Sequence, residues 1–256
     1  MAEPIFKVNS VSYAYTASIP ALRDLDLTVE RGARVALIGA NGTGKSTLLS
    51  ILDALVFPDS GEVRAYGKRL DARAMRDETA QREFRRKVGF VFQNPDAQLF
   101  CPTVREDIAF GPLQLGVSRE ETLDRLDAVA RRLRIEALLD RAPHQLSVGE
   151  KRKVAIAGVL AIGCDAILLD EPTAGLDPRT TRDIIGVIED EHRAGKTVVL
   201  ATHDLHAVEE LADAVCVFGP EGRIARSGTP AEILGDHDFL REMNLMHEHS
   251  SRYLHP

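Results

Sequence analysis

The sequence predicts an α/β fold in which a mostly parallel sheet is covered by helices on both faces. The first observation is a set of five short, continuously apolar runs, which are typical of strands buried on both faces. The second is the helical pattern between the later runs, because alternating strands and helices favour parallel pairing. The expected strands are residues 34–39, 88–92, 166–170, 197–202 and 214–218.

Two further regions accompany this core. Residues 6–15 and 22–30 partly alternate between apolar and polar side chains, and Gly32 marks a turn, so we expect a small antiparallel β subdomain. The segment from about 95 to 160 shows no clear strand, and its apolar spacing predicts an inserted helical subdomain. One face of a helix there would carry Leu123, Leu126, Val129 and Leu133.

The composition narrows the class of protein. No apolar run among the 256 residues approaches the length of a membrane span, and the N-terminus lacks a signal region, so we expect a chain soluble by itself. The scattered Cys101, Cys164 and Cys216 fit packing roles in a reducing cytosol. The net charge of −7 argues weakly against a general nucleic-acid binder. The basic cluster at 81–87 favours a solvated face, with contact to a membrane surface as the alternative.

The segment GANGTGKST predicts a phosphate-binding loop. It fits the pattern G-x-x-x-x-G-K-S/T, with an apolar strand before it and a helical run after it. Glycines let backbone N–H groups wrap around phosphates, and the helix N-terminus adds partial positive charge. We expect Lys45 to reach the β- and γ-phosphates and the Ser46 hydroxyl to bind Mg²⁺. The expected nucleotide-binding residues are Gly39, Asn41, Gly42, Thr43, Gly44, Lys45, Ser46 and Thr47.

Two adjacent carboxylates end the apolar strand AILLD. Ligands of open α/β sheets bind at strand ends, and burying charge without a purpose is costly. Asp170 is therefore expected to hold Mg²⁺, directly or through water, and Glu171 to orient and deprotonate the attacking water. The alternative is two exposed loop carboxylates.

The stretch LSVGE at 146–150 predicts a helix start that attracts an anion. Ser147 and Glu150 have the spacing of a capping box. Val148 and Gly149 then lie in the first helical turn, where backbone N–H groups have no helical partner. An ordinary helix cap is the alternative at this point.

Together these motifs resemble those of ABC-type ATPases over about residues 5–230. The phosphate loop, Gln93 after VGFVF, LSVGE, ILLDEPTAGLDP and ATHD stand in the order and spacing of that family. The resemblance implies a P-loop NTPase fold of the ABC cassette type with a RecA-like core. On that basis residues 1–230 form an ABC ATPase domain and residues 231–256 a histidine-containing tail. It also implies a head-to-tail dimer in which LSVGE of one copy closes on the ATP held by the other.

The resemblance assigns roles that spacing alone does not. Gln93 would contact the γ-phosphate and Mg²⁺ and couple them to the helical subdomain. His203 would contact the γ-phosphate and help position the water, and Asp177 would act across the dimer. Tyr15 is similar to the aromatic residue that stacks on adenine, with Tyr13 as the second candidate.

One position departs from the family pattern. Ser147 and Gly149 would contact the partner's ATP, but Val148 stands where the family usually has glycine. The N–H of Val148 remains, so the anion-binding helix end should survive, while its isopropyl group would crowd the phosphate or tilt the helix start. We therefore predict reduced but present ATPase activity, with Val148→Gly equal or faster.

The resemblance narrows to the ATPases of energy-coupling-factor transporters, which take up vitamins and transition-metal ions. The segments 90–112 and 153–161 are similar to that group. Segment 90–112 would receive coupling helices of a transmembrane subunit. An exposed Phe100 would belong to that interface, and the alternative is a Phe100 buried in the core. The residues expected near this contact are Asp96, Gln98, Leu99 and Phe100.

The C-terminal residues 243–256 resemble the ends of cobalt and nickel transporter ATPases. His247 and His249 with Glu248 would suit either ion, although a polar terminus without metal is the favoured alternative. We predict a Mg²⁺-dependent ATPase on the cytoplasmic face of the cell membrane that powers cobalt or nickel import, with cobalt preferred on overall resemblance. It would pair with an identical copy, a transmembrane coupling subunit and metal-binding membrane subunits, and bind no nucleic acid.

Three alternatives stay open. One is the ATPase of a vitamin importer of the same type. Another is a non-transport ABC ATPase, although no heptad array lies between the phosphate loop and LSVGE. The third is a soluble kinase, which would need a phosphoacceptor site and would not need LSVGE.

Overall fold

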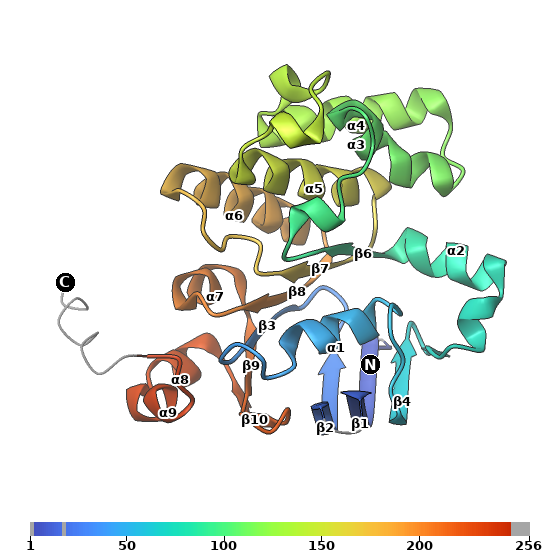
Figure 1. Ribbon diagram of the computed structural model, residues 1–256. Helices are drawn as coiled ribbons and strands as arrows, with labels where there is room; N and C mark the ends of the chain where they lie inside the picture. The colour runs from blue at the N-terminus through green and yellow to red at the C-terminus, as the bar shows by residue number, and fades with distance from the viewer. Residues whose placement is uncertain (1–2, 17–18, 247–256) are drawn as a thin grey trace. The chain divides into compact units, whose positions relative to one another are not determined.

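The computed structural model describes residues 3–16 and 19–246 of the chain (Figure 1). These residues divide into two compact units, one formed by the described residues up to 72 together with residues 199–246 and the other by residues 73–198. The strand β8 (Thr197–Thr202) crosses the boundary between these units, and every one of its residues is buried. The residues of the predicted site are therefore distributed over both units.

The first unit contains a small antiparallel sheet with the strand order β2-β1-β4-β5. β1 pairs with β2 and with β4, so that Phe6 lies opposite both Val29 and Ala65. Phe6 and Val8 are buried while Lys7 between them is exposed, as the two-residue period of a strand requires. This sheet confirms the predicted antiparallel β subdomain. Its strands are β1 (Phe6–Thr16), β2 (Ile19–Val29), β4 (Ser60–Ala65) and β5 (Lys68–Arg69).

The same unit contains the strands next to the phosphate loop. β3 and β9 pair in parallel, and β10 pairs antiparallel with β9. β3 leads directly into the glycine-rich loop, and α1 begins where that loop ends (Figure 1). These elements are β3 (Arg34–Ile38), α1 (Lys45–Leu52), β9 (Ala214–Phe218) and β10 (Ile224–Gly228).

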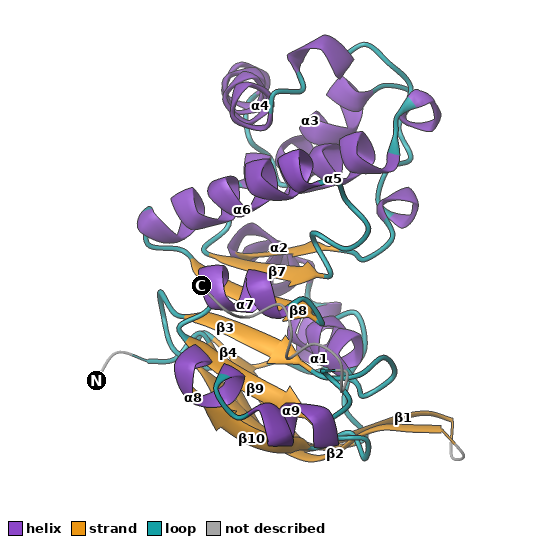
Figure 2. Cartoon of the chain, turned by 90° about the vertical axis from the view of Figure 1, so that its left-hand side faces the viewer, coloured by secondary structure: helices purple, strands orange, loops and turns teal. Residues whose placement is uncertain are grey.

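The residues after 226 form structure that the sequence pattern does not reveal. Two short helices, α8 (Pro230–Leu234) and α9 (His237–Glu242), follow β10, and α8 contacts β9 and β10 (Figure 2). Ile233 and Leu240 are fully buried in the same apolar cluster as residues of β3, β9 and α7 (Leu205–Leu211). Leu234, Phe239, Met243, Leu245 and Met246 pack against that cluster as well, so the first unit includes residues up to 246 that the pattern assigned to a polar tail.

The second unit is built around the parallel pair β6 and β7. Val88 of β6 lies opposite Ala166 of β7, and all residues of both strands are buried, as the apolar runs predict. α2 carries the basic cluster and buries only Phe84, which agrees with a solvated face. The elements are η1 (Ala74–Arg76), α2 (Glu78–Lys87), β6 (Val88–Val91), β7 (Ala166–Asp170) and α6 (Pro178–Arg193).

Residues 95–160, all of which the structure describes, contain helices and no strand. α3 (Val104–Gln114) and α4 (Arg119–Leu133) pack against α5 (Val148–Ile162) (Figure 2). One expectation was wrong here: Leu123 is 41% exposed, because the buried stripe of α4 runs through Thr122 instead. Short 3₁₀ helices lie at η2 (Pro95–Ala97), η3 (Glu136–Leu138) and η4 (Pro143–Gln145).

Within residues 3–16 and 19–246, no helix is long and apolar enough to cross a membrane.

Candidate active site

The phosphate loop in the first unit is closed around Lys45. The buried Lys45 Nζ donates to the carbonyl oxygens of Gly39 at 2.7 Å and Ala40 at 3.0 Å. Gly44 caps α1 with a φ of 102°, and a β-carbon there would lie 2.5 Å from the carbonyl oxygen of Ala21. Only glycine fits this position. A β-carbon on Gly42 would meet nothing within 4 Å, so this part of the loop is its open side.

The remaining loop residues divide into buried and exposed groups. Thr43 and Thr47 are buried, and the Thr43 hydroxyl donates to the carbonyl oxygen of Ala40 at 2.9 Å. Asn41 and Ser46 are exposed, which leaves their polar side chains available to a ligand. The loop therefore combines a fixed backbone with accessible oxygen and nitrogen donors, as a phosphate site requires.

The two candidate adenine-stacking residues differ in exposure. Tyr15 is 58% exposed and its hydroxyl lies 2.9 Å from the Thr47 hydroxyl, which places the tyrosine beside the helix that follows the phosphate loop. Tyr13 is half-buried, and its ring packs edge-on against that of Tyr15, with 5.3 Å between centroids. Tyr15 thus offers the more accessible ring.

His203 belongs to the same unit and directly follows β8. Its side chain is exposed, and the next residue, Asp204, caps α7 by accepting from the backbone N–H of His206 at 3.0 Å. The backbone N–H of Asp204 donates to the buried Thr202 hydroxyl at 3.0 Å. These contacts fix the backbone on both sides of the predicted γ-phosphate contact.

The second unit carries the carboxylate pair. Asp170 and Glu171 are only 5% and 4% exposed, so the alternative of two exposed loop carboxylates is wrong. Glu171 has a φ of 48°, a left-handed conformation that is strained for a non-glycine residue. Strain of this kind is concentrated at functional sites, where surrounding contacts hold it in place.

The oxygen chemistry of these residues fits Mg²⁺. Asp170 in the second unit offers a buried carboxylate and Ser46 in the first an exposed hydroxyl, and both are hard oxygen donors of the type that this ion prefers. Among the described residues, no group of three histidine, cysteine or acidic side chains forms an all-protein metal cluster. His247, Glu248 and His249 lie outside the described residues.

Gln93 follows β6 and is exposed. Both backbone polar groups of the preceding residue, Phe92, are hydrogen-bonded. The Phe92 N–H donates to Gln98 Oε1 at 3.2 Å, and the Phe92 carbonyl accepts from Arg152 Nη1 at 2.9 Å. Burial lowers the pKa of the Arg152 guanidinium, and the nearby carboxylates of Asp170 and Glu171 oppose that shift.

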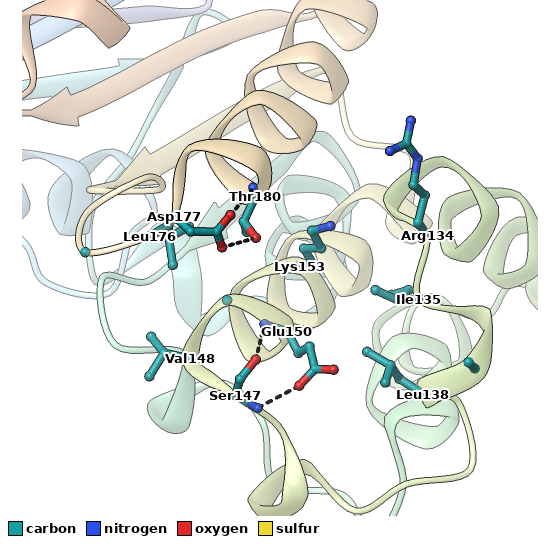
Figure 3. A pocket seen from close by; sticks show the side chains of 13 residues that line it. Arg134, Ile135, Leu138, Ser147, Val148, Glu150, Lys153, Leu176, Asp177 and Thr180 are labelled. Carbon is teal, nitrogen blue, oxygen red and sulfur yellow. Dashed lines mark hydrogen bonds between the residues drawn. The ribbon is translucent and has the colours of Figure 1, made fainter.

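The helix start at LSVGE has the predicted cap. Ser147 Oγ accepts from the Glu150 N–H at 3.3 Å, and Glu150 Oε2 accepts from the Ser147 N–H at 2.8 Å (Figure 3). These hydrogen bonds lower the pKa of the Glu150 carboxyl. Val148 is the first helical residue and is 61% exposed. Valine thus leaves the capped start of α5 intact; crowding of a phosphate stays a prediction.

A pocket of about 470 Å³ lies between this helix start and the start of α6 (Figure 3). Asp177 lines it and caps α6, because its Oδ1 accepts from the backbone N–H groups of Arg179 and Thr180 at 3.0 Å. A 2.6 Å hydrogen bond from the Thr180 hydroxyl to Oδ2 contributes most to lowering the pKa of Asp177. Asp177 therefore has a structural role in addition to the predicted one at the dimer interface.

The proposed docking segment presents an aromatic surface. Phe100 is 66% exposed, so the alternative of a buried Phe100 is wrong, and its ring packs edge-on against the exposed Phe110 at 4.9 Å between centroids. The buried Asp107 shapes this segment by accepting from the N–H groups of Phe100 and Cys101, both at 3.0 Å. Asp96, also expected here, accepts from Lys151 Nζ at 2.6 Å.

The three cysteines behave as packing residues. Burial raises the pKa of the Cys164 thiol to about 12 and that of Cys101 to about 11, and it also raises that of Cys216. No pair of them forms a disulfide. Raised pKa values keep these thiols protonated at neutral pH. Cys164 and Cys216 are buried, as packing roles predict, whereas Cys101 is half-buried.

The sequence did not single out Arg152 or Asp107. Both are charged residues inside polar runs, which usually indicate a solvated face, yet both are buried. The sequence gives no signal for Arg152, because each of its neighbours in EKRK is also charged. For Asp107 the only hint is its place in the first turn of α3, where acidic residues are common.

The loop, the strand-end carboxylates and the capped helix start define a P-loop nucleotide hydrolase. A family model described as ABC transporter matches residues 22–174. The nickel import ATP-binding protein NikO of Rhodobacter capsulatus is 46% identical over 95% of this chain and 96% of its own length. The energy-coupling factor transporter ATP-binding protein EcfA of Methanothermobacter thermautotrophicus is 44% identical over 94% of this chain and 76% of its own.

A solved structure is similar along nearly the whole chain. CbiO1 from Clostridium perfringens, described as part of the ABC transporter complex cbiONQ, superposes with a TM-score of 0.79 at 36% identity, covering 95% of this chain and 96% of its own. The chain belongs to the ABC transporter family, as one of its ATP-binding, ATP-hydrolysing subunits. The similarity also confirms the predicted ABC cassette fold.

Proposed function

We propose that this chain hydrolyses ATP to power import of cobalt or nickel ions by a transporter of the energy-coupling-factor type. The observation that carries the proposal is the pair of anion-binding helix starts: Gly44 leads into α1, and Ser147 leads into α5. A kinase or a simple P-loop hydrolase needs the first but not the second. The 46% identity to NikO, whose name states nickel import, supports the choice of a metal ion.

The proposed chemistry divides among residues of the two units. Lys45 would bind the β- and γ-phosphates in exchange for its present contacts with the loop carbonyl groups. Ser46, Asp170 and Gln93 would hold Mg²⁺, which when bound neutralises phosphate charge. The remaining residues of the loop from Gly39 to Thr47 would bind the phosphates as the sequence predicts, and Tyr15 would stack on adenine.

Glu171 would act as the general base on the attacking water. Its burial favours that role, because a carboxylate shielded from solvent can be presented to one water molecule in a fixed orientation. His203 would contact the γ-phosphate and help position that water. Since general-base catalysis contributes about 10²–10⁴-fold, its loss should stop turnover while sparing ATP binding.

Two identical copies would form the working ATPase. The exposed Ser147 and the half-buried Gly149 lie at a helix start whose free N–H groups suit the γ-phosphate bound by a second copy. Asp177 would contact the partner from the neighbouring helix start. The chain has one phosphate loop and one LSVGE, so each site would need both copies.

The membrane partner would bind at the surface of Phe100, Phe110 and Leu113. All three are large apolar side chains with more than a third of their surface exposed, and they lie in one segment of the second unit. Such a surface suits an apolar coupling helix from a transmembrane subunit. This docking would place the chain on the cytoplasmic face of the membrane, beside metal-binding membrane subunits.

Uptake in cells that express the chain with its membrane subunits tests the proposal. We expect cells with the wild-type chain to accumulate radioactive cobalt or nickel, and cells with Glu171→Gln to accumulate neither. Glu120→Gln, an exposed change on α4, is the matched control and should leave uptake intact. If cells with Glu171→Gln lose uptake of a vitamin instead, the transported substrate is a vitamin and not a metal ion. If these cells show no transport defect at all, a non-transport ATPase is favoured.

A further inference from the structure

Arg152 is a buried cation in the helix that begins at LSVGE. It is 4% exposed, whereas its neighbours Lys151 and Lys153 form ion pairs with Asp96 and Asp183. Burying a guanidinium is costly unless its hydrogen bonds and charge are compensated. The free-energy cost of burying the Arg152 guanidinium must therefore be offset by specific contacts.

The contact is with the peptide immediately before Gln93. Arg152 Nη1 donates to the Phe92 carbonyl oxygen at 2.9 Å, while the Phe92 N–H donates to Gln98 Oε1 at 3.2 Å. Gln98 Nε2 in turn donates to the carbonyl oxygen of Ala155 at 3.0 Å. The Phe92 peptide is thus attached to α5 directly through Arg152 and indirectly through Gln98.

The strand-end carboxylates compensate the charge of Arg152. Asp170 and Glu171 both act on its guanidinium electrostatically, and all three belong to the second unit. Arg152 Nε has no hydrogen-bond partner within the described part of the chain. The Arg152 side chain is therefore held by its hydrogen bond to the Phe92 carbonyl and by the negative charges of Asp170 and Glu171. Arg152 of α5 thus interacts with both the Gln93 segment and the end of β7.

We infer that Arg152, with Gln98, is a positioning residue that makes the start of α5 and the Gln93 segment move together. Arg152 lies five positions after Ser147, which is about 7.5 Å along a rigid helix. Under the proposed function, Ser147 binds the ATP of the second copy while Gln93 senses the ATP of its own. The contact therefore couples the two nucleotides of the dimer and makes hydrolysis cooperative.

The test measures ATP hydrolysis by the assembled transporter as a function of ATP concentration. Arg152→Gln and Gln98→Leu should each lower kcat by about tenfold, the size expected for losing a charge-assisted or buried hydrogen bond, with little change in KM. Both should also bring the Hill coefficient to one. Arg152→Lys, which keeps the charge and a donor, should recover part of the cooperativity. Arg131→Gln, an exposed change on α4, should match the wild-type chain.

The outcomes separate this inference from the proposed function on which it rests. If the wild-type transporter hydrolyses ATP cooperatively and both variants keep its Hill coefficient, the inference is wrong and the proposed function stands. If the wild-type transporter hydrolyses ATP without cooperativity, the inference also fails, and the proposed function is then decided by metal uptake alone. Should Arg152→Gln fail to fold, Gln98→Leu and Arg152→Lys decide the question through the same measurements.

Discussion

The phosphate loop and LSVGE each lead into the N-terminus of a helix, but they tolerate side chains differently. At Gly44 an added β-carbon would lie 2.5 Å from a carbonyl oxygen, and φ is 102°. At Val148 a whole isopropyl group is 61% exposed and the capping box beside it is complete. The difference teaches that a helix start needs glycine where the chain is crowded or left-handed, and not at every position where a family motif shows one.

Gly44→Ala should have the largest effect. The backbone conformation alone costs about 1–3 kcal/mol for a non-glycine residue, and the clash with Ala21 adds to that cost. We expect a lower free energy of unfolding in urea and loss of measurable ATP binding. Gly186→Ala, where a β-carbon meets nothing within 4 Å inside a helix, is the control and should be neutral or stabilising. Equal behaviour of the two variants would show that the loop is not crowded.

Ser147→Ala comes next, because it removes the cap but leaves the backbone. Loss of an N-cap side chain costs about 1 kcal/mol of stability, which urea unfolding should detect. Under the proposed dimer it should also slow ATP hydrolysis at saturating ATP, while binding of ATP to a single copy is unchanged. Thr229→Ala removes the corresponding cap from α8 and should lower stability alone. Full ATPase activity of Ser147→Ala would show that the Ser147 side chain is not needed to bind the partner's ATP.

The stability of this cap should depend on pH. Hydrogen bonds from Ser147 lower the pKa of Glu150, so the folded state binds a proton there less readily than the unfolded state. The contribution is fully present above the ordinary glutamate pKa and is lost as the pH falls through the lowered folded value. We expect the wild-type chain to lose more stability than Glu150→Gln between pH 6 and the acid range near pH 4. Parallel stability curves for the two chains would contradict this.

Val148→Gly should have the smallest effect. The helix start is already capped, so glycine restores only room for the phosphate, and we expect ATP hydrolysis equal to or up to about threefold faster than wild type. Glycine also costs a few tenths of a kcal/mol to about 1 kcal/mol of helix stability, which unfolding should show as a small loss. Much slower hydrolysis by Val148→Gly would mean that the valine packs against the partner in a working site.

The sequence predicted the parts of the fold that depend on local pattern. The apolar runs at β3, β6, β7, β8 and β9 are long enough to read as strands, and the phosphate loop and capping box are fixed by residue type and spacing. It did not predict α8 and α9, since each is short and its burial depends on strands distant in sequence. Arg152 was missed for the same reason: its partners Phe92 and Asp170 come from other elements.

The raised pKa values of the native thiols have a practical consequence for measuring closure of the dimer. With a pKa of about 11, the Cys101 thiol carries very little of the reactive thiolate at pH 7. A maleimide dye would therefore label a new cysteine at the exposed Val148 far faster than the native ones. One substitution is then enough to install a fluorescent reporter at the face where a second copy is expected to arrive.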